Sequence, residues 1–68
     1  MDASIIVNGE PARVPPGAAV ATLLHALGLE GRRLAVELNG TVVPRSRHGS
    51  TLLAAGDRVE IVHAIGGG

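Results

Sequence analysis

Three kinds of residue are missing from this sequence of 68 residues: it contains no cysteine, no lysine and no Phe, Tyr or Trp. Without cysteine there is no disulfide framework, no thiolate nucleophile and no cysteine-bound zinc, which is compatible with a reducing compartment. We therefore expect a cytoplasmic protein. Without aromatic rings there is no platform on which a base could stack, so most single-strand nucleic-acid-binding modules are excluded.

Charge of either sign is also scarce. Six arginines balance six acidic residues, so the formal net charge is zero and the chain has no electrostatic footprint for nucleic acid or an anionic membrane. No apolar run is long enough to span a bilayer, and no basic stretch followed by an apolar run opens the sequence as a secretory signal would. We expect no nucleic-acid partner, no membrane association and a monomer when the protein is free.

The length allows one small domain, with no room for a deep substrate pocket inside its own core. Hydrophobic residues nevertheless make up 46% of the chain. They include enough Val, Leu and Ile for an aliphatic core that folds without metal or disulfide. We expect a domain over residues 1–65 and a glycine tail at 66–68.

The first part of the chain has the pattern of a β-hairpin. Residues 5–7 are β-branched, Asn8-Gly9 is typical of a tight hairpin turn, and residues 11–14 return as a second strand. Pro11 lacks a backbone N–H, so this second strand is predicted to lie at a sheet edge. The Pro-Pro-Gly sequence at 15–17 ends it.

A helix is predicted over residues 18–27. Its apolar positions recur at i, i+3, i+4 and i+7, and they are Val20, Leu23, Leu24 and Leu27. Gly28 is placed as a left-handed C-terminal cap, with Leu29 folding back on the last turn. The N-cap position falls on Ala18 or Ala19, which have no side chain able to cap the first turn.

The second part of the chain returns to short strands. They are predicted at 34–38, 41–43 and 58–65, with turns at Asn39-Gly40 and Gly56-Asp57, a charged loop at 45–50 and a single helical turn at 51–55. The last strand is long enough to lie centrally in a sheet. The order of elements predicts an α+β fold of the β-grasp type, with a mixed sheet of four to five strands and one main helix on one face.

No group of residues indicates catalysis or metal binding. His25, His48 and His63 are not at ligand spacing, and Asp57 lies at a turn where aspartate commonly bonds its own backbone rather than pairing with Glu60. No phosphate-binding loop or nucleophile motif occurs. We predict no catalytic and no metal-binding residue.

The glycine tripeptide Gly66, Gly67 and Gly68 is the remaining feature. It is either a frayed end or linker remnant, or a tail that threads a narrow channel of another protein, because glycine has no Cβ to clash. In the second case the reactive group is the carboxylate of Gly68. Ordering such a tail costs about 1–2 kcal/mol per residue, which contacts from the partner must offset.

Several short segments occur in an order and spacing that resemble the ThiS family, the prokaryotic ubiquitin-like sulfur carriers of the thiamine pathway. They are IIVNGE at 5–10, the helix with Val20, Leu23 and Leu24, LNG at 38–40, VPR at 43–45, GDRVEIV at 56–62 and IGGG at 65–68. The resemblance covers the whole chain. Alanine stands where the family commonly has a helix-capping threonine, and His63 occupies a position often filled otherwise.

The resemblance implies a cosubstrate and not an enzyme. An E1-like (ThiF-type) adenylyltransferase would use ATP to adenylate the carboxylate of Gly68, and sulfur from a donor such as a cysteine desulfurase would displace AMP. The resulting thiocarboxylate would supply sulfur to thiazole synthase (ThiG-type). Gly66 and Gly67 would lie in the channels of both partners, and the chain itself would bind no cofactor.

The same resemblance implies a docking surface on the exposed sheet face near the last strand, with Val62 and the segment Val43, Pro44 and Arg45. Cross-strand packing is the alternative role for Val62, and a solvated loop charge is the alternative for Arg45. Two alternative functions stay open: a sulfur carrier for another pathway (molybdopterin, an amino acid or a tRNA base), and a β-grasp module that only binds a partner.

Overall fold

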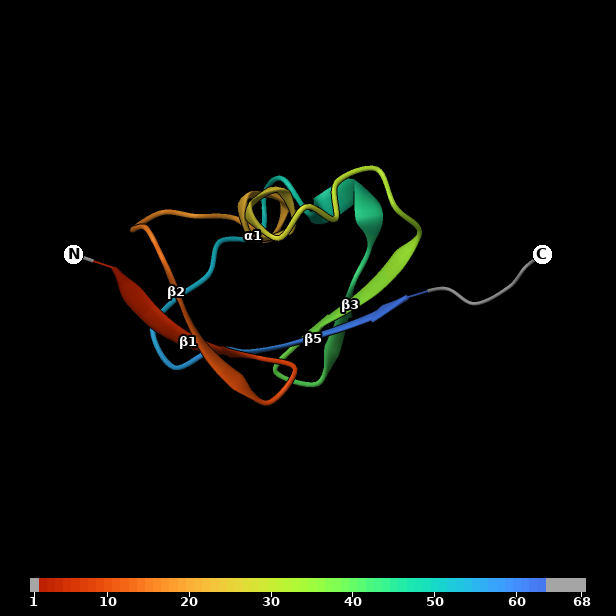
Figure 1. Ribbon diagram of the computed structural model, residues 1–68. Helices are drawn as coiled ribbons and strands as arrows, with labels where there is room; N and C mark the ends of the chain where they lie inside the picture. The colour runs from red at the N-terminus through yellow and green to blue at the C-terminus, as the bar shows by residue number, and fades with distance from the viewer. Residues whose placement is uncertain (1, 64–68) are drawn as a thin grey trace.

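A computed structural model describes residues 2–63 as a five-stranded sheet with a helix on one face (Figure 1). In chain order the elements are β1 (Ala3–Val7), β2 (Glu10–Val14), α1 (Val20–Ala26), β3 (Leu34–Leu38), β4 (Thr41–Val43), the 3-10 helix η1 (Arg45–Arg47) and β5 (Arg58–His63). The strands are arranged β2-β1-β5-β3-β4, with β1 and β5 parallel and the other neighbours antiparallel. The predicted α+β class, mixed sheet and central last strand are confirmed.

Two Asn-Gly turns close the two hairpins. Asn8 and Asn39 have φ angles of 50° and 52°, and Gly9 and Gly40 after them have φ angles of 83° and 86°. Two consecutive positive φ values define the type I′ turn, whose twist matches that of antiparallel strands. Both predicted turns are confirmed. Pro11 lies in β2 at the edge of the sheet, also as predicted.

The last turn of α1 ends in a Schellman motif. The N–H of Gly28, at φ 74°, donates to the carbonyl oxygen of His25 over 3.0 Å, and the N–H of Leu29 donates to that of Leu24 over 2.9 Å. Leu29 then packs against the core, as predicted. Leu27 is the exception to the predicted apolar stripe. It is the C-cap residue and 47% exposed, since the chain turns away before another helical turn could bury it.

The first turn of α1 is capped by backbone carbonyls of a distant segment. Ala19 is the N-cap residue, one of the two positions predicted; its own side chain makes no cap, but Oγ1 of Thr22 accepts from the N–H of Ala19 over 3.1 Å. The N–H of Val20 donates to the carbonyl oxygen of Thr51 over 2.9 Å, and the N–H of Ala21 donates to that of His48 over 2.8 Å. These two carbonyls satisfy donors that a helix start otherwise leaves without a partner.

The prediction of a helical turn at 51–55 is wrong. Leu52 forms an isolated antiparallel bridge with Ala19, and the N–H of Leu53 donates to the carbonyl oxygen of Ala18 over 2.8 Å. These bonds hold the segment extended beside the start of α1. The short helical segment is η1, which lies within the stretch predicted as a charged loop.

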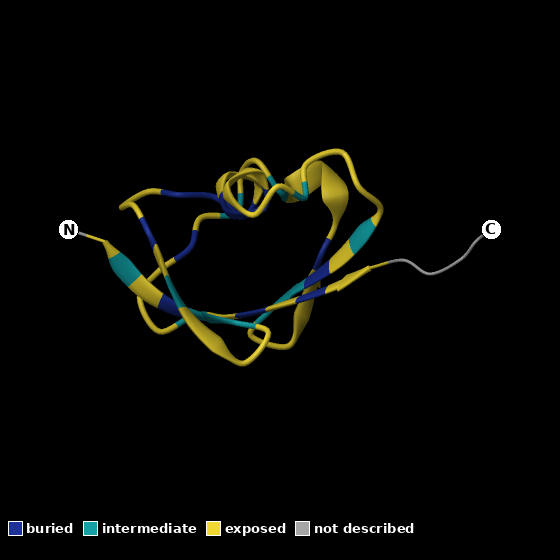
Figure 2. Ribbon diagram, in the orientation of Figure 1, coloured by how far each residue is buried: buried dark blue, intermediate teal, exposed yellow. Residues whose placement is uncertain are grey.

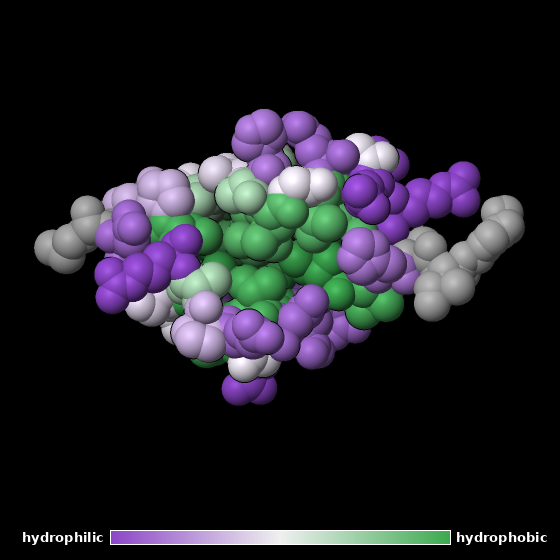
Figure 3. Space-filling model, in the orientation of Figure 1, coloured by the Kyte–Doolittle hydropathy of each residue, from purple (hydrophilic) through white to green (hydrophobic). Residues whose placement is uncertain are grey.

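The core lies between α1 and the sheet, because alternate strand positions face the helix (Figure 2). Its buried aliphatic residues include Ile5, Val14, Val36, Val59 and Ile61 from the strands and Val20, Leu23 and Leu24 from α1. Figure 3 shows apolar atoms gathered between the helix and the sheet, framed by hydrophilic side chains. Among residues 2–63, no helix has the length and apolar character needed to cross a membrane.

Candidate functional site

Strand β5 is the part of the fold that leads toward the glycine tripeptide. Backbone pairing with β1 matches Ile6 with Arg58 and Val7 with Val59. Beyond these two pairs, the side chain of Asn8 bonds the backbone of β5. Its Oδ1 accepts from the N–H of Ile61 over 2.7 Å, and its Nδ2 donates to the carbonyl oxygen of Ile61 over 3.3 Å. The amide of Asn8 therefore continues the β1–β5 pairing as a further peptide group would.

Asn39 holds the beginning of β5 in a similar way. Its Oδ1 accepts from the N–H of Arg58 over 2.9 Å, and its Nδ2 donates to Oδ1 of Asp57 over 3.0 Å. Asp57 Oδ2 in turn accepts from the N–H of Ala54 over 2.8 Å, so this carboxylate bonds the local backbone as expected. Two asparagines from matching turns thus fix the central strand at two points.

The predicted tail residues Gly66, Gly67 and Gly68 lie outside the described residues. The described part of β5 ends at His63. The boundary between a domain at 1–65 and a tail at 66–68 therefore stays a prediction.

The residues predicted for a docking surface do not share one face. Val62 is 58% exposed on the sheet face opposite α1, and Pro44 and Arg45 are exposed after β4. Val43, however, is only 8% exposed, because alternation along β4 turns its side chain toward the core. Its neighbour Val42 is 61% exposed and faces outward.

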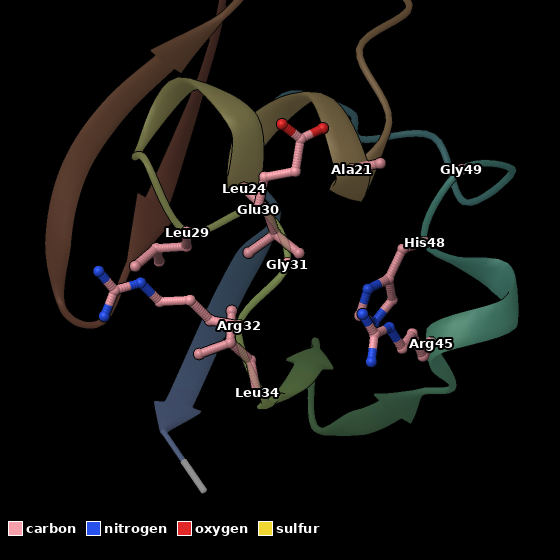
Figure 4. A pocket seen from close by; sticks show the side chains of 10 residues that line it. All are labelled: Ala21, Leu24, Leu29, Glu30, Gly31, Arg32, Leu34, Arg45, His48 and Gly49. Atoms are coloured by element: carbon pink, nitrogen blue, oxygen red, sulfur yellow. The ribbon is translucent and has the colours of Figure 1, made fainter.

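Arg45 belongs to a cleft on the helix side of the sheet (Figure 4). Leu24 and Leu34 contribute apolar walls, Arg45 lines the cleft from η1, and Arg32 lies at its edge in the loop after α1 with its guanidinium directed away from Arg45. Val62 lies on the other face of the sheet, so the structure does not bring it together with Arg45. The sequence alone does not reveal this cleft, because its walls come from segments far apart in the chain.

The sheet face that α1 leaves uncovered has an acidic centre. We call outer face the set of outward positions on β3, β4 and β5, which are Ala35, Glu37, Val42, Arg58, Glu60 and Val62. Glu37 is paired directly with Glu60 on one side and with Val42 on the other, and Ala35 is paired with Val62. The alternation in the sequence indicates that both glutamates point outward, but their opposition depends on strand register, which no local pattern reveals.

The three histidines are dispersed. His25 Nδ1 lies within hydrogen-bond distance of Glu30 Oε1, at 3.0 Å, and both side chains are 73% exposed. His48 Nε2 lies 3.0 Å from the carbonyl oxygen of Val43, and His63 is exposed on β5. The described part of the chain holds no group of three His, Cys, Asp or Glu side chains that could bind a metal ion.

A comparison with protein families matches residues 5–68 to the model described as the ThiS family. The chain belongs to the ThiS family. The crystal structure of a thiamine biosynthesis protein (ThiS) from Geobacter metallireducens superposes on this ThiS-family chain with a TM-score of 0.81 and 37% identity, covering 96% of this chain and 99% of that one. The structural match confirms the predicted β-grasp fold.

Similar sequences occur in proteins of two sizes. Thiazole synthase of Magnetococcus marinus is 42% identical over 64 residues, which are 94% of this ThiS-family chain and 20% of that protein. This chain therefore spans about a fifth of the length of that relative. The uncharacterized protein ycf40 of Porphyra purpurea is 37% identical over 65 residues, which cover 96% of this chain and 92% of that protein.

Proposed function

We propose that this ThiS-family chain is a sulfur carrier for thiazole formation in thiamine biosynthesis. The carboxylate of Gly68 attacks the α-phosphate of ATP on an E1-like (ThiF-type) adenylyltransferase, and pyrophosphate leaves. A persulfide sulfur supplied by a cysteine desulfurase then attacks the acyl carbon, and AMP leaves. A thiol reduces the resulting acyl disulfide to the thiocarboxylate, which supplies sulfur to a ThiG-type thiazole synthase.

The observation that carries the proposal is the extent of the family match. It runs over residues 5–68 and so includes Gly66, Gly67 and Gly68 together with the strand that leads to them. Glycines without Cβ atoms suit a narrow channel, and the side-chain bonds to Ile61 and Arg58 anchor the strand from which the tail emerges. The chain's own residues thus hold and present a carboxylate, while the activating chemistry belongs to the partner.

Thiazole formation is favoured over other destinations of the sulfur by one observation. Two relatives that contain a segment similar to this chain, from Magnetococcus marinus and Paramagnetospirillum magneticum, are thiazole synthases. A carrier segment and the enzyme that consumes its sulfur would gain from being joined, because linkage raises the effective concentration of one for the other. We therefore propose a ThiG-type enzyme as the acceptor.

We propose the outer face around Val62 as the docking surface of the carrier. Val42 and Val62 offer exposed apolar area there, whereas Arg45 lines the cleft on the helix side of the sheet and lies outside this surface. Val43 supports this surface from the core side and makes no contact of its own.

Intact-mass spectrometry of the protein isolated from cells tests the carrier function. We expect a species heavier by the exchange of one oxygen for sulfur, and fragmentation should place the exchange on Gly68. The same spectrum tests whether Gly68 ends the chain in the cell, which the proposal requires. Deletion of Gly68 should abolish ATP–pyrophosphate exchange by the adenylyltransferase without changing the melting temperature, whereas a module that only binds would tolerate the deletion.

A further inference from the structure

The outer face of the free protein contains two like charges on directly opposed strand residues. Glu37 of β3 and Glu60 of β5 are register partners, and their side chains leave the sheet on the same side. The Cβ atoms of directly opposed strand residues lie about 5 Å apart, and like charges in that position destabilise a sheet. Arg58 lies two residues before Glu60 on the same face, but within residues 2–63 no cation is within ion-pair distance of either carboxylate.

Exposed apolar side chains lie beside the two carboxylates. Val42 is paired with Glu37 from the far side and is 61% exposed, while Val62 follows Glu60 on the same face and is 58% exposed. The face therefore combines a small acidic centre with apolar area at two sides. Fully buried interface centres are commonly apolar, with charges paired where they occur.

We propose that the outer face binds a protein partner through an arginine or lysine of that partner, which enters between Glu37 and Glu60 while apolar side chains of the partner cover Val42 and Val62. The inference rests on the proposed function, in which this face docks on the adenylyltransferase. A cation placed between the carboxylates relieves their repulsion, so the complex gains an interaction that the free carrier lacks.

The same charges disfavour other occupants of the acidic centre. A second copy of this chain that placed its own Glu37 and Glu60 on this pair would add two more carboxylates there, so that arrangement is disfavoured. Nucleic acid would be repelled for the same reason. The acidic centre selects a basic protein surface, and it also raises the rate of encounter with such a surface at low salt.

The test is a comparison of dissociation constants for the adenylyltransferase of the same organism, measured by titration calorimetry at low and high salt. We expect Glu60→Gln to weaken binding roughly fivefold and Glu60→Lys to weaken it more than about tenfold, the range typical of losing or reversing one charge in an interface. Binding by the unchanged protein should weaken with salt, and binding by Glu60→Lys should not. Glu10→Gln is the matched control, because Glu10 is an exposed glutamate of the edge strand β2 outside the outer face.

Thermal unfolding of the same variants separates docking from folding. Because Glu60→Gln removes a like charge and Glu60→Lys creates an opposite-charge pair with Glu37, both variants should melt at an equal or higher temperature while binding less tightly. Equal dissociation constants, no binding by the unchanged protein, or weaker binding that follows a lower melting temperature would overturn the proposal. If the Glu60 variants weaken binding as expected but the unchanged protein supports no ATP–pyrophosphate exchange, the result would support this surface and refute the proposed carrier function.

Discussion

Replacement of Asn8 by glycine isolates the contribution of its side chain to the central strand. Glycine keeps the positive φ of the turn, so the variant removes the two hydrogen bonds to Ile61, of 2.7 and 3.3 Å, without adding backbone strain. Each such bond contributes about 0.5–1.5 kcal/mol net, so the free energy of unfolding should fall by about 1–3 kcal/mol. For a domain of this size that corresponds to a drop in melting temperature of roughly 5–20 °C.

The assay combines urea unfolding with amide hydrogen exchange. The amide of Ile61 should lose protection in Asn8→Gly, while the amide of Val36, in the buried part of β3, should exchange only through global unfolding. A free energy of unfolding within about 0.5 kcal/mol of the original, or unchanged protection at Ile61, would refute the reasoning that the Asn8 amide completes the strand pairing.

Asn39→Gly is the matched control for this experiment. It has the same residue type in the same type of turn and also loses two bonds to the β5 region, but those bonds, to Arg58 and Asp57, are solvent-exposed. Water can replace them, whereas the bonds of Asn8 are partly buried. The loss of stability should therefore be smaller for Asn39→Gly, and an equal or larger loss would contradict the argument.

Two further predictions concern the core and the helix end. Ile5→Ala removes most of a side chain that is 1% exposed and should lower the free energy of unfolding by about 2–5 kcal/mol. Because a loss of this size is comparable with the whole stability of so small a domain, urea unfolding should show a midpoint shifted close to zero denaturant. Gly28→Ala should cost about 1–2 kcal/mol because Gly28 has φ 74°, although no atom lies within 4 Å of the added Cβ. A Gly28→Ala melting temperature equal to that of the original would show that the turn adopts another conformation.

Local patterns were sufficient for most of the elements. The alternation at 34–38, the helical spacing at 20–24 and the Asn-Gly pairs each reflect preferences of a few neighbouring residues, and the structure has each element where these patterns place it. The segment 51–55 shows where such patterns fail. Its extended form depends on Ala18 and Ala19, so no preference within the segment itself reveals it.

The candidate site likewise has some features that local sequence patterns reveal and others that only the tertiary structure reveals. The glycine tripeptide, the outward position of Val62 and the resemblance to the ThiS family were accessible from residues alone, since they depend on composition, alternation and order along the chain. The pairing of Glu37 with Glu60 and the bonds from Asn8 to Ile61 were not, because they join residues that are distant in the sequence. Strand register and side-chain bonds across the sheet exist only once the chain has closed on itself, and these contacts shape the surface offered to a partner.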